Sequence, residues 1–232
     1  MTLVTYIDHM GSDLSVVNAA RVSFGKSSSF DGRVGGPNVL KKSDARLIKY
    51  LATHKHTSPF GHAFASFHIK TPLFVHAQCV KHKFLRSNTV SRRYVDATPE
   101  FYEPEEWRGR SADKKQGSEG SVCLSVFRSN CLKSAAGSAL KIYEELLEDG
   151  VSPEMARMVL PQSMLTEFFW SGSLDAWADM CVLRLAEDSQ YETRVVAKQI
   201  STKMSELFCN HSSLILGVLC KYETRVVGGF GK

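Results

Sequence analysis

The sequence has few of the features that assign a chain to a class at first sight. Its six cysteines form no C-x-x-C pair, which argues against a zinc site and against a disulfide framework. No apolar run approaches the roughly 20 residues that a membrane span needs. The opening stretch M-T-L-V-T-Y-I-D becomes polar too early for a signal peptide. We expect a soluble, cytoplasmic protein without a metal, whose cysteines are packing residues.

Glycine and serine gather between positions 25 and 38, but not in the order of a phosphate-binding P-loop. The stretch reads G-K-S-S-S-F-D-G-R-V-G-G-P-N and has no periodicity, which predicts a flexible loop. The net charge is only +5 at pH 7. Such a mild charge suits small phosphate ligands as well as nucleic acid.

The length of 232 residues predicts one domain over 1–232, which would bury roughly 70% of the surface of its unfolded chain. Aromatic and β-favouring residues predict strands over 63–70 and 164–170. The polar stretch 96–120 predicts a surface excursion with little chemistry, and 21–24 is expected to extend away from the first helix. Apolar spacing predicts helices over 13–20, 43–53, 152–160, 173–185 and 191–208, and a long core helix over 121–148.

One hexapeptide, Y-E-T-R-V-V, occurs at 191–196 and again at 222–227. A single pair is not a solenoid, which needs at least three repeats. We interpret 217–232 as a tail that arose by local duplication. Function is assigned to the first copy alone, because Ile215 and Lys221 stand where Arg184 and Gln190 precede it.

The stretch from Gln78 to Tyr94, Q-C-V-K-H-K-F-L-R-S-N-T-V-S-R-R-Y, carries most of the chemistry. Gln78, Lys81 and His82 are spaced by three and four residues, so a helix starting near Thr71 would present them on one face. The run after them supplies hydroxyls, an amide and two guanidinium groups suited to phosphate. A basic helix is more often a solvated surface, but the apolar run 72–80 before this one favours a pocket.

These residues resemble the signature of the flavin-dependent thymidylate synthases (ThyX). In that family R-H-R, seven residues and Ser are followed by x-R-Y, and here K-H-K at 81–83 is followed by S-R-R-Y at 91–94. Further motifs occur in the order of the family: A-A-R-V-S-F at 19–24, H-x-S-P-F-x-H at 56–62, A-R-M-V-L-P at 156–161, F-F-W at 168–170, and L-R followed by Q-Y-E within 183–192.

The resemblance implies an α+β fold, a single domain in which a β-sheet is flanked by helices that include one long helix. It implies a homotetramer whose active sites combine residues from several subunits. The implied reaction is reductive methylation of dUMP to dTMP. Methylenetetrahydrofolate supplies the carbon, FAD relays hydride, and NADPH reduces the flavin.

The resemblance also implies roles for individual residues. Arg184 would be the catalytic residue and would face the uracil ring, where its guanidinium cannot act as a base but can stabilise negative charge. Its alternative is a structural ion pair with Glu187 or Asp188. The dUMP-binding positions are Gln78, Lys81, Thr89, Val90, Ser91, Arg92, Arg93, Arg157 and Arg184. The FAD-binding positions are His56, Ser58, Lys81, His82, Lys83, Ser173, Asp175 and Asp179.

Several of these residues have an ordinary alternative. His82 could be a satisfied helix histidine, Ser58 a turn residue before Pro59, and Asp175 and Asp179 exposed carboxylates. Ser91 has no neighbouring base in sequence that would make it a nucleophile, so a binding or orienting role is favoured.

The chain departs from the pattern of the family at six of these positions. Lys81 and Lys83 replace arginines and keep the charge but lose the planar fork. The others are Thr89 for Glu, Arg92 for Gly, and Ser173 and Asp179 for Asn. Two alternatives therefore stay open: a phosphate- or nucleic-acid-binding module with a basic surface, and an FAD-binding homologue without synthase activity.

Overall fold

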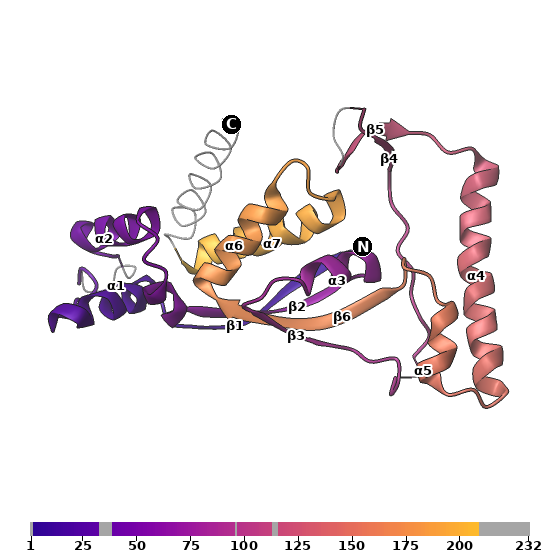
Figure 1. The fold of residues 1–232 in the computed structure, drawn as a ribbon, viewed down its shortest axis with the longest axis horizontal. Coiled ribbons are helices and arrows are strands. Elements are labelled where there is room, and N and C mark those ends of the chain that lie inside the picture. The colour runs from indigo at the N-terminus through magenta and orange to yellow at the C-terminus, as the bar shows by residue number, and fades with distance from the viewer. Residues whose placement is uncertain (1, 33–38, 96, 113–115, 209–232) are drawn as a thin grey trace, which may run out of the picture.

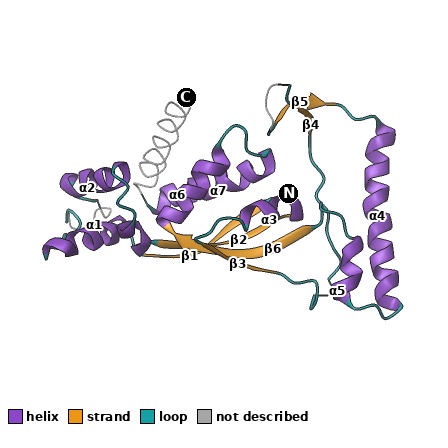
Figure 2. Cartoon of the chain, in the orientation of Figure 1, coloured by secondary structure: helices purple, strands orange, loops and turns teal. Residues whose placement is uncertain are grey.

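The computed structural model describes residues 2–32, 39–95, 97–112 and 116–208. Its centre is a four-stranded sheet with the order β1-β2-β6-β3, and every neighbouring pair is antiparallel (Figure 2). The strands are β1 (Leu3–Met10), β2 (Phe64–Pro72), β6 (Leu165–Ser173) and β3 (Leu85–Thr89).

The two central strands alternate buried and less buried residues because one face of the sheet is packed. Phe67 pairs with Trp170, and both side chains are almost fully buried. The Trp177 ring meets each of their rings edge on at a centroid distance of 5.1 Å. Its indole Nε1 donates to the carbonyl of Ala65 at 3.2 Å, so the polar atom of this buried side chain is satisfied.

Three helices cover that face of the sheet (Figure 1). They are α3 (Leu73–Cys79), α6 (Leu174–Leu185) and α7 (Tyr191–Leu207). The apolar spacing of α6 places Trp177 and Cys181 in the core together with Ile200 and Met204 of α7. This layer positions the C-terminal end of α3 and the C-terminal end of α6 for the site described below.

The remaining helices lie at the two ends of the sheet (Figure 1). One end carries α1 (Asp13–Arg21) and α2 (Lys42–Thr53), followed by the 3-10 helix η2 (Ser58–His62). The other end carries α4 (Val126–Glu148), α5 (Pro153–Ala156) and the 3-10 helix η3 (Arg157–Val159). The α+β class and the long helix predicted from the sequence are confirmed.

The long helix α4 is not a core helix within this chain. Tyr143 is its one buried residue, packed with Ala156, Leu160 and Met164. Phe127 is 76% exposed. The prediction of core scaffolding is therefore wrong for the single chain, because an apolar pattern predicts that a helix face is covered but does not say by which chain.

Other boundaries and elements also differ from prediction. Strand β1 and the hairpin of β4 (Trp107–Arg110) and β5 (Ser118–Val122) were not predicted. Because Ser118–Val122 pairs with the other strand of this hairpin, the long helix starts at Val126, with Ser125 as its N-cap. Residues Val22–Phe24 form a 3-10 turn, η1, rather than an extended run.

The cysteines are not uniformly packing residues. Cys79 and Cys181 are buried, whereas Cys123 and Cys131 are exposed, which corrects the prediction for those two. Cys209, Cys220 and the predicted tail 217–232 lie outside the described residues, as do positions 33–38 of the glycine-rich loop. Among the described helices none has the length and apolarity to cross a membrane.

Candidate active site

The K-H-K motif lies on the turn that follows α3, not on the helix itself. The helix ends at Cys79, where the amide of His82 donates to the Cys79 carbonyl at 3.3 Å. The chain then reverses into β3, whose Leu85 pairs with Gly172 of β6. A Cβ at Gly172 would lie 2.2 Å from the Leu85 side chain, so the glycine is needed for this close approach. The predicted helical face shared by Gln78, Lys81 and His82 is therefore wrong.

Tertiary structure nevertheless brings these residues to Arg184, at the end of α6. The Arg184 Nε donates to Nε2 of His82 at 3.0 Å, and its Nη2 donates to the Gln78 carbonyl at 2.9 Å. Burial, and then the positive charge of Arg184, lower the pKa of His82 to about 4. A neutral imidazole that accepts at Nε2 carries its proton on Nδ1. The guanidinium is thus held in a fixed direction by two acceptors.

Arg184 lines a cavity of about 820 Å³, which we call the Arg184 cavity. The Ser189 hydroxyl, also at its wall, is buried and has no hydrogen-bond partner among the described residues. A buried unpaired hydroxyl facing a cavity is available to a ligand. The polar side chains of the wall are those of Gln78, Lys81, Tyr102, Glu106, Arg108, Gln116, Ser118, Ser163, Arg184, Asp188, Ser189, Gln190 and Glu192.

The rest of the predicted nucleotide-binding set, except Arg93, lines a different cavity of about 840 Å³, which we call the Arg157 cavity. It lies where β3 ends, between α5, η3 and the neighbouring ends of β2 and β6. The Ser91 hydroxyl accepts from the amide of Arg93 at 3.3 Å, which is a turn rather than a catalytic contact. The predicted residues at this wall are Thr89, Val90, Ser91, Arg92 and Arg157.

The groups around the Arg157 cavity are partly engaged with one another. The Arg93 Nε lies 3.1 Å from the Glu154 carboxylate, and both side chains are half exposed. Thr89 and Nε2 of His76 are 3.0 Å apart, and burial lowers the pKa of His76. Because none of the described residues lines both cavities, the described part of one chain does not assemble the complete predicted dUMP set in a single place.

The predicted flavin-binding residues gather at one end of the sheet. The Leu85 to Gly172 pairing places the turn that carries Lys81, His82 and Lys83 beside the end of β6, where Ser173 lies. The 3-10 helix that begins with Ser58 leads to Ala63, whose carbonyl accepts from the amide of Leu174 at 2.9 Å. Three segments that are distant in sequence therefore meet there.

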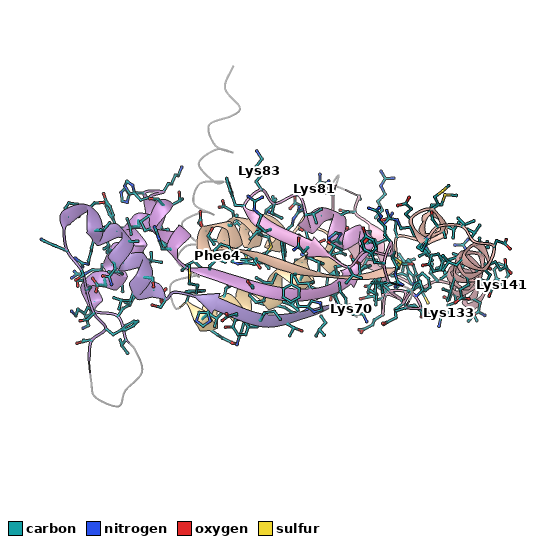
Figure 3. The ribbon with its side chains drawn as sticks, turned by 90° about the horizontal axis from the view of Figure 1, so that it is seen from below. Phe64, Lys70, Lys81, Lys83, Lys133 and Lys141 are labelled. Atoms are coloured by element: carbon teal, nitrogen blue, oxygen red, sulfur yellow. The ribbon has the colours of Figure 1, made fainter. Side chains whose placement is uncertain are left out.

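The two lysines of this group point outward along the same edge of the molecule (Figure 3). Neither Lys81 nor Lys83 makes a hydrogen bond or an ion pair with another residue in the described parts of the chain. Such unpaired cations offer donors and positive charge that fit a phosphate-bearing group.

The carboxylates on α6 are placed differently from the lysines. The Ser173 hydroxyl donates to Asp175 Oδ1 at 2.5 Å at the start of α6. Asp179 is exposed and has a partner within the protein. His56 stacks near the ring of Tyr50, with centroids 6.2 Å apart.

Gln190, which contacts the Gln78 side chain, and Glu192 beyond it were not predicted as site residues. Glu192, only 6% exposed, accepts from Arg108 and from the amide of Gln190, the latter at 3.1 Å. Arg108 and Tyr102 belong to the excursion 96–120, so the prediction that it carries little chemistry is wrong. The sequence did offer one signal for Glu192. It is a glutamate at the start of an apolar helix, and a glutamate that is buried there needs a partner for its charge.

Comparison with known proteins gives consistent matches over most of the chain. The model of the family described as "Thymidylate synthase complementing protein" matches residues 5–209. A flavin-dependent thymidylate synthase of Thermus thermophilus is 39% identical over 203 residues, which is 88% of this chain and 71% of that protein. That of Thermosipho africanus is 34% identical over 202 residues, which is 86% of this chain and 84% of that protein.

A solved structure matches the fold as well. The UMP/dUMP methylase PolB from Streptomyces cacaoi, bound with 5-Br dUMP, has a TM-score of 0.76 and 27% sequence identity. The match covers 92% of this chain and 94% of that chain.

Proposed function

Because this chain belongs to the flavin-dependent thymidylate synthase family, we propose that it is a methyltransferase that converts dUMP to dTMP with a bound flavin. The observation that carries the proposal is the position of Arg184. Its guanidinium is directed by a neutral histidine and a backbone carbonyl at the wall of a cavity large enough for a nucleotide base. That is a fixed positive charge suited to an electron-rich pyrimidine.

The pyrimidine would lie in the Arg184 cavity, with Gln78 and Lys81 beside it. As C5 of uracil becomes nucleophilic, negative charge develops on the N3 and O4 side of the ring. A guanidinium already in position stabilises this charge without reorganising at the moment of reaction. His82 contributes by orientation, since its Nε2 fixes the direction of the Arg184 Nε proton.

The phosphate of dUMP would be bound by the second set of residues. Backbone amides near Ser91, together with Arg92, Arg93 and Arg157, offer the donors and charge that a phosphate needs. Since Ser91, Arg92 and Arg157 line the Arg157 cavity of one chain, we infer that this set completes the Arg184 cavity of another copy in a homotetramer. The exposed apolar residues of α4, Phe127 among them, support such an assembly because no described part of the chain covers them.

The lysine-bearing end of the sheet would hold FAD. Lys81 and Lys83 would neutralise its phosphates, while His56, Ser58, His82 and Ser173 would contact the remainder. We assign Asp175 and Asp179 to the margin of this site, because Asp175 is engaged by Ser173 and Asp179 is exposed. When bound, the flavin supplies hydride transfer. Methylenetetrahydrofolate as carbon donor and NADPH as reductant complete the proposed reaction.

The test is a visible spectrum followed by an assay. The purified protein is titrated with FAD, and product is then measured with dUMP, methylenetetrahydrofolate and NADPH. The proposal requires flavin binding and dTMP formation. Flavin binding without turnover would favour the homologue that lacks synthase activity. A colourless protein with a steeply salt-dependent affinity for nucleic acid would favour the basic-surface module. UMP is included as a substrate because the Streptomyces methylase is named for both nucleotides.

A further inference from the structure

A chain of hydrogen bonds runs from the hairpin β4–β5 to Gln78 in the Arg184 cavity. Arg108 donates to Glu192 Oε1, which also accepts from the Tyr102 hydroxyl at 3.5 Å. Glu192 Oε2 accepts from Nε2 of Gln190 at 3.1 Å. Oε1 of Gln190 accepts from Nε2 of Gln78. This series of hydrogen bonds is continuous, and each side chain in it lines the Arg184 cavity.

Only at the Glu192 end of this hydrogen-bond chain is it fixed which group donates and which accepts. The amides of Gln190 and Gln78 can each turn over and exchange their oxygen and nitrogen. The Thr193 hydroxyl donates to Oε1 of Gln78 at 3.2 Å, but a hydroxyl can equally accept, so it does not decide the direction. The Glu192 carboxylate, paired with the Arg108 guanidinium, has no proton to give. It therefore obliges Gln190 to turn its nitrogen toward Glu192 and its oxygen toward Gln78.

The geometry points to Glu192 as a positioning residue for the pyrimidine: through Gln190, its carboxylate fixes the direction in which Gln78 presents its amide to the nucleotide. This inference rests on the proposed function, in which Gln78 contacts dUMP. The Gln78 amide keeps one N–H and one oxygen lone pair beyond its contacts with Gln190 and Thr193. A reversed amide exchanges the places of these two groups, so a ring carbonyl of uracil would meet a lone pair instead of a donor.

The backbone of Gln78 is bound directly to the proposed catalytic residue. Its carbonyl accepts from Nη2 of Arg184 at 2.9 Å, so Gln78 is held at its main chain by the proposed catalytic residue and at its side chain by Gln190. The hairpin also has a defined attachment, because the Arg108 guanidinium lies over the Tyr191 ring at 4.2 Å and its Nε donates to Ser118 Oγ at 3.0 Å. Arg108 thus holds Glu192 in place from outside the sheet.

The experiment is calorimetric titration of dUMP into the flavin-loaded enzyme. In Glu192→Gln the new amide can turn its oxygen to Arg108 and its nitrogen to residue 190, which reverses Gln190 and then Gln78. We expect dUMP affinity to fall by roughly 10- to 100-fold, the scale of a lost hydrogen bond with an unpaired acceptor facing the ligand. Flavin content is expected to stay at the wild-type level.

A double variant separates the effect of the Gln78 amide direction from the effect of losing the Arg108 to Glu192 ion pair. In Gln190→Glu with Glu192→Gln the acceptor-only group moves to position 190, so Gln78 recovers its native direction while Arg108 still lacks a carboxylate at 192. We expect it to recover most of the affinity lost in Glu192→Gln. A purely structural role of the Arg108 to Glu192 pair predicts no recovery, and that result would overturn the inference.

The variant Gln190→Met leaves the Arg108 to Glu192 ion pair intact. It cuts the chain between Glu192 and Gln78, and we expect a dUMP affinity several-fold below wild type with unchanged flavin binding. Wild-type affinity in this variant would also overturn the inference. Glu206→Gln serves as the control, because it removes an exposed carboxylate from the same helix. If the wild-type enzyme itself binds no dUMP, the proposed function fails and the inference falls with it. If wild type binds dUMP and Gln78→Ala binds it equally well, the inference alone is overturned.

Discussion

The Nε of Arg184 donates a hydrogen bond to Nε2 of His82 at 3.0 Å, across 102 positions of sequence. The contact requires an unprotonated Nε2, in agreement with burial and the neighbouring guanidinium lowering the pKa of His82 to about 4. Arg184 is therefore held in direction and in place at the cavity wall.

Replacing Arg184 by Ala removes the proposed stabiliser of charge on the uracil ring. We expect dTMP formation at saturating dUMP to fall by about 100-fold or more, the usual scale for one such group. Flavin should stay bound, because Arg184 is not among its proposed ligands, although it contacts one of them, His82. Lys198→Ala, which removes an exposed cation from the adjacent helix, is the control. Near-normal turnover of Arg184→Ala would reduce Arg184 to a structural residue.

His82 should make stability depend on pH. Its pKa in the folded protein, about 4, lies below the usual 6.5, so the unfolded chain binds more protons between these values. Stability therefore rises with pH over this window and is lost as the pH falls. His82→Gln, whose amide oxygen can still accept from Arg184, should show a shallower decline of the thermal midpoint between pH 6.5 and 4. Parallel curves for the two proteins would contradict the assignment.

Cys79 lies inside the signature stretch but should not take part in chemistry. Burial raises the pKa of its thiol to about 12, although Arg184 opposes the shift. A buried neutral thiol is a poor nucleophile. We expect Cys79→Ala to keep dTMP formation within a few-fold of wild type. Loss of product with flavin still bound would show that the thiol reacts.

Restoring the arginines of the family at positions 81 and 83 should tighten ligand binding. A guanidinium offers two parallel donors to a phosphate, whereas an ammonium acts as a point charge. We expect the double variant Lys81→Arg with Lys83→Arg to bind FAD several-fold more tightly, as measured by flavin fluorescence. Weaker binding would mean that this site has adapted to lysine.

If the active site combines two chains, variants of different cavities should complement each other. Arg184→Ala and Arg157→Ala would each be nearly inactive alone. Subunits exchanged between them would form some sites with both residues intact, and part of the activity should return. The same variant mixed with itself is the control. An absence of recovery after proven subunit exchange would place both residues in one chain's site.

The sequence predicts the packed elements better than the exposed ones. Trp177 and Ile200 follow helical spacing and are buried as expected, because periodicity reports a face covered by the same chain. Strand β3 was not predicted, since L-R-S-N-T is polar at the edge of the sheet and its pairing with β6 depends on the close approach at Gly172. For α4 the same periodicity gives a covered face without saying which chain covers it.

The candidate site shows a similar division. The resemblance to the family motifs predicted Arg184 and the K-H-K segment as site residues. It did not predict that the segment leaves the helix or that His82 accepts from Arg184. The Arg108 to Glu192 pair joins residues 84 positions apart. Such a contact is set by tertiary structure, and the local sequence around Glu192 does not show that Arg108 is its partner.

The central claim is that this chain methylates dUMP with a bound flavin, and the most direct measurement is product formation by the purified protein. With FAD, methylenetetrahydrofolate and NADPH present, dUMP should be converted to dTMP, detected by chromatography, and omission of FAD from the stripped protein should abolish the conversion. Conversion that does not need flavin, or no dTMP from a flavin-loaded protein, would contradict the account.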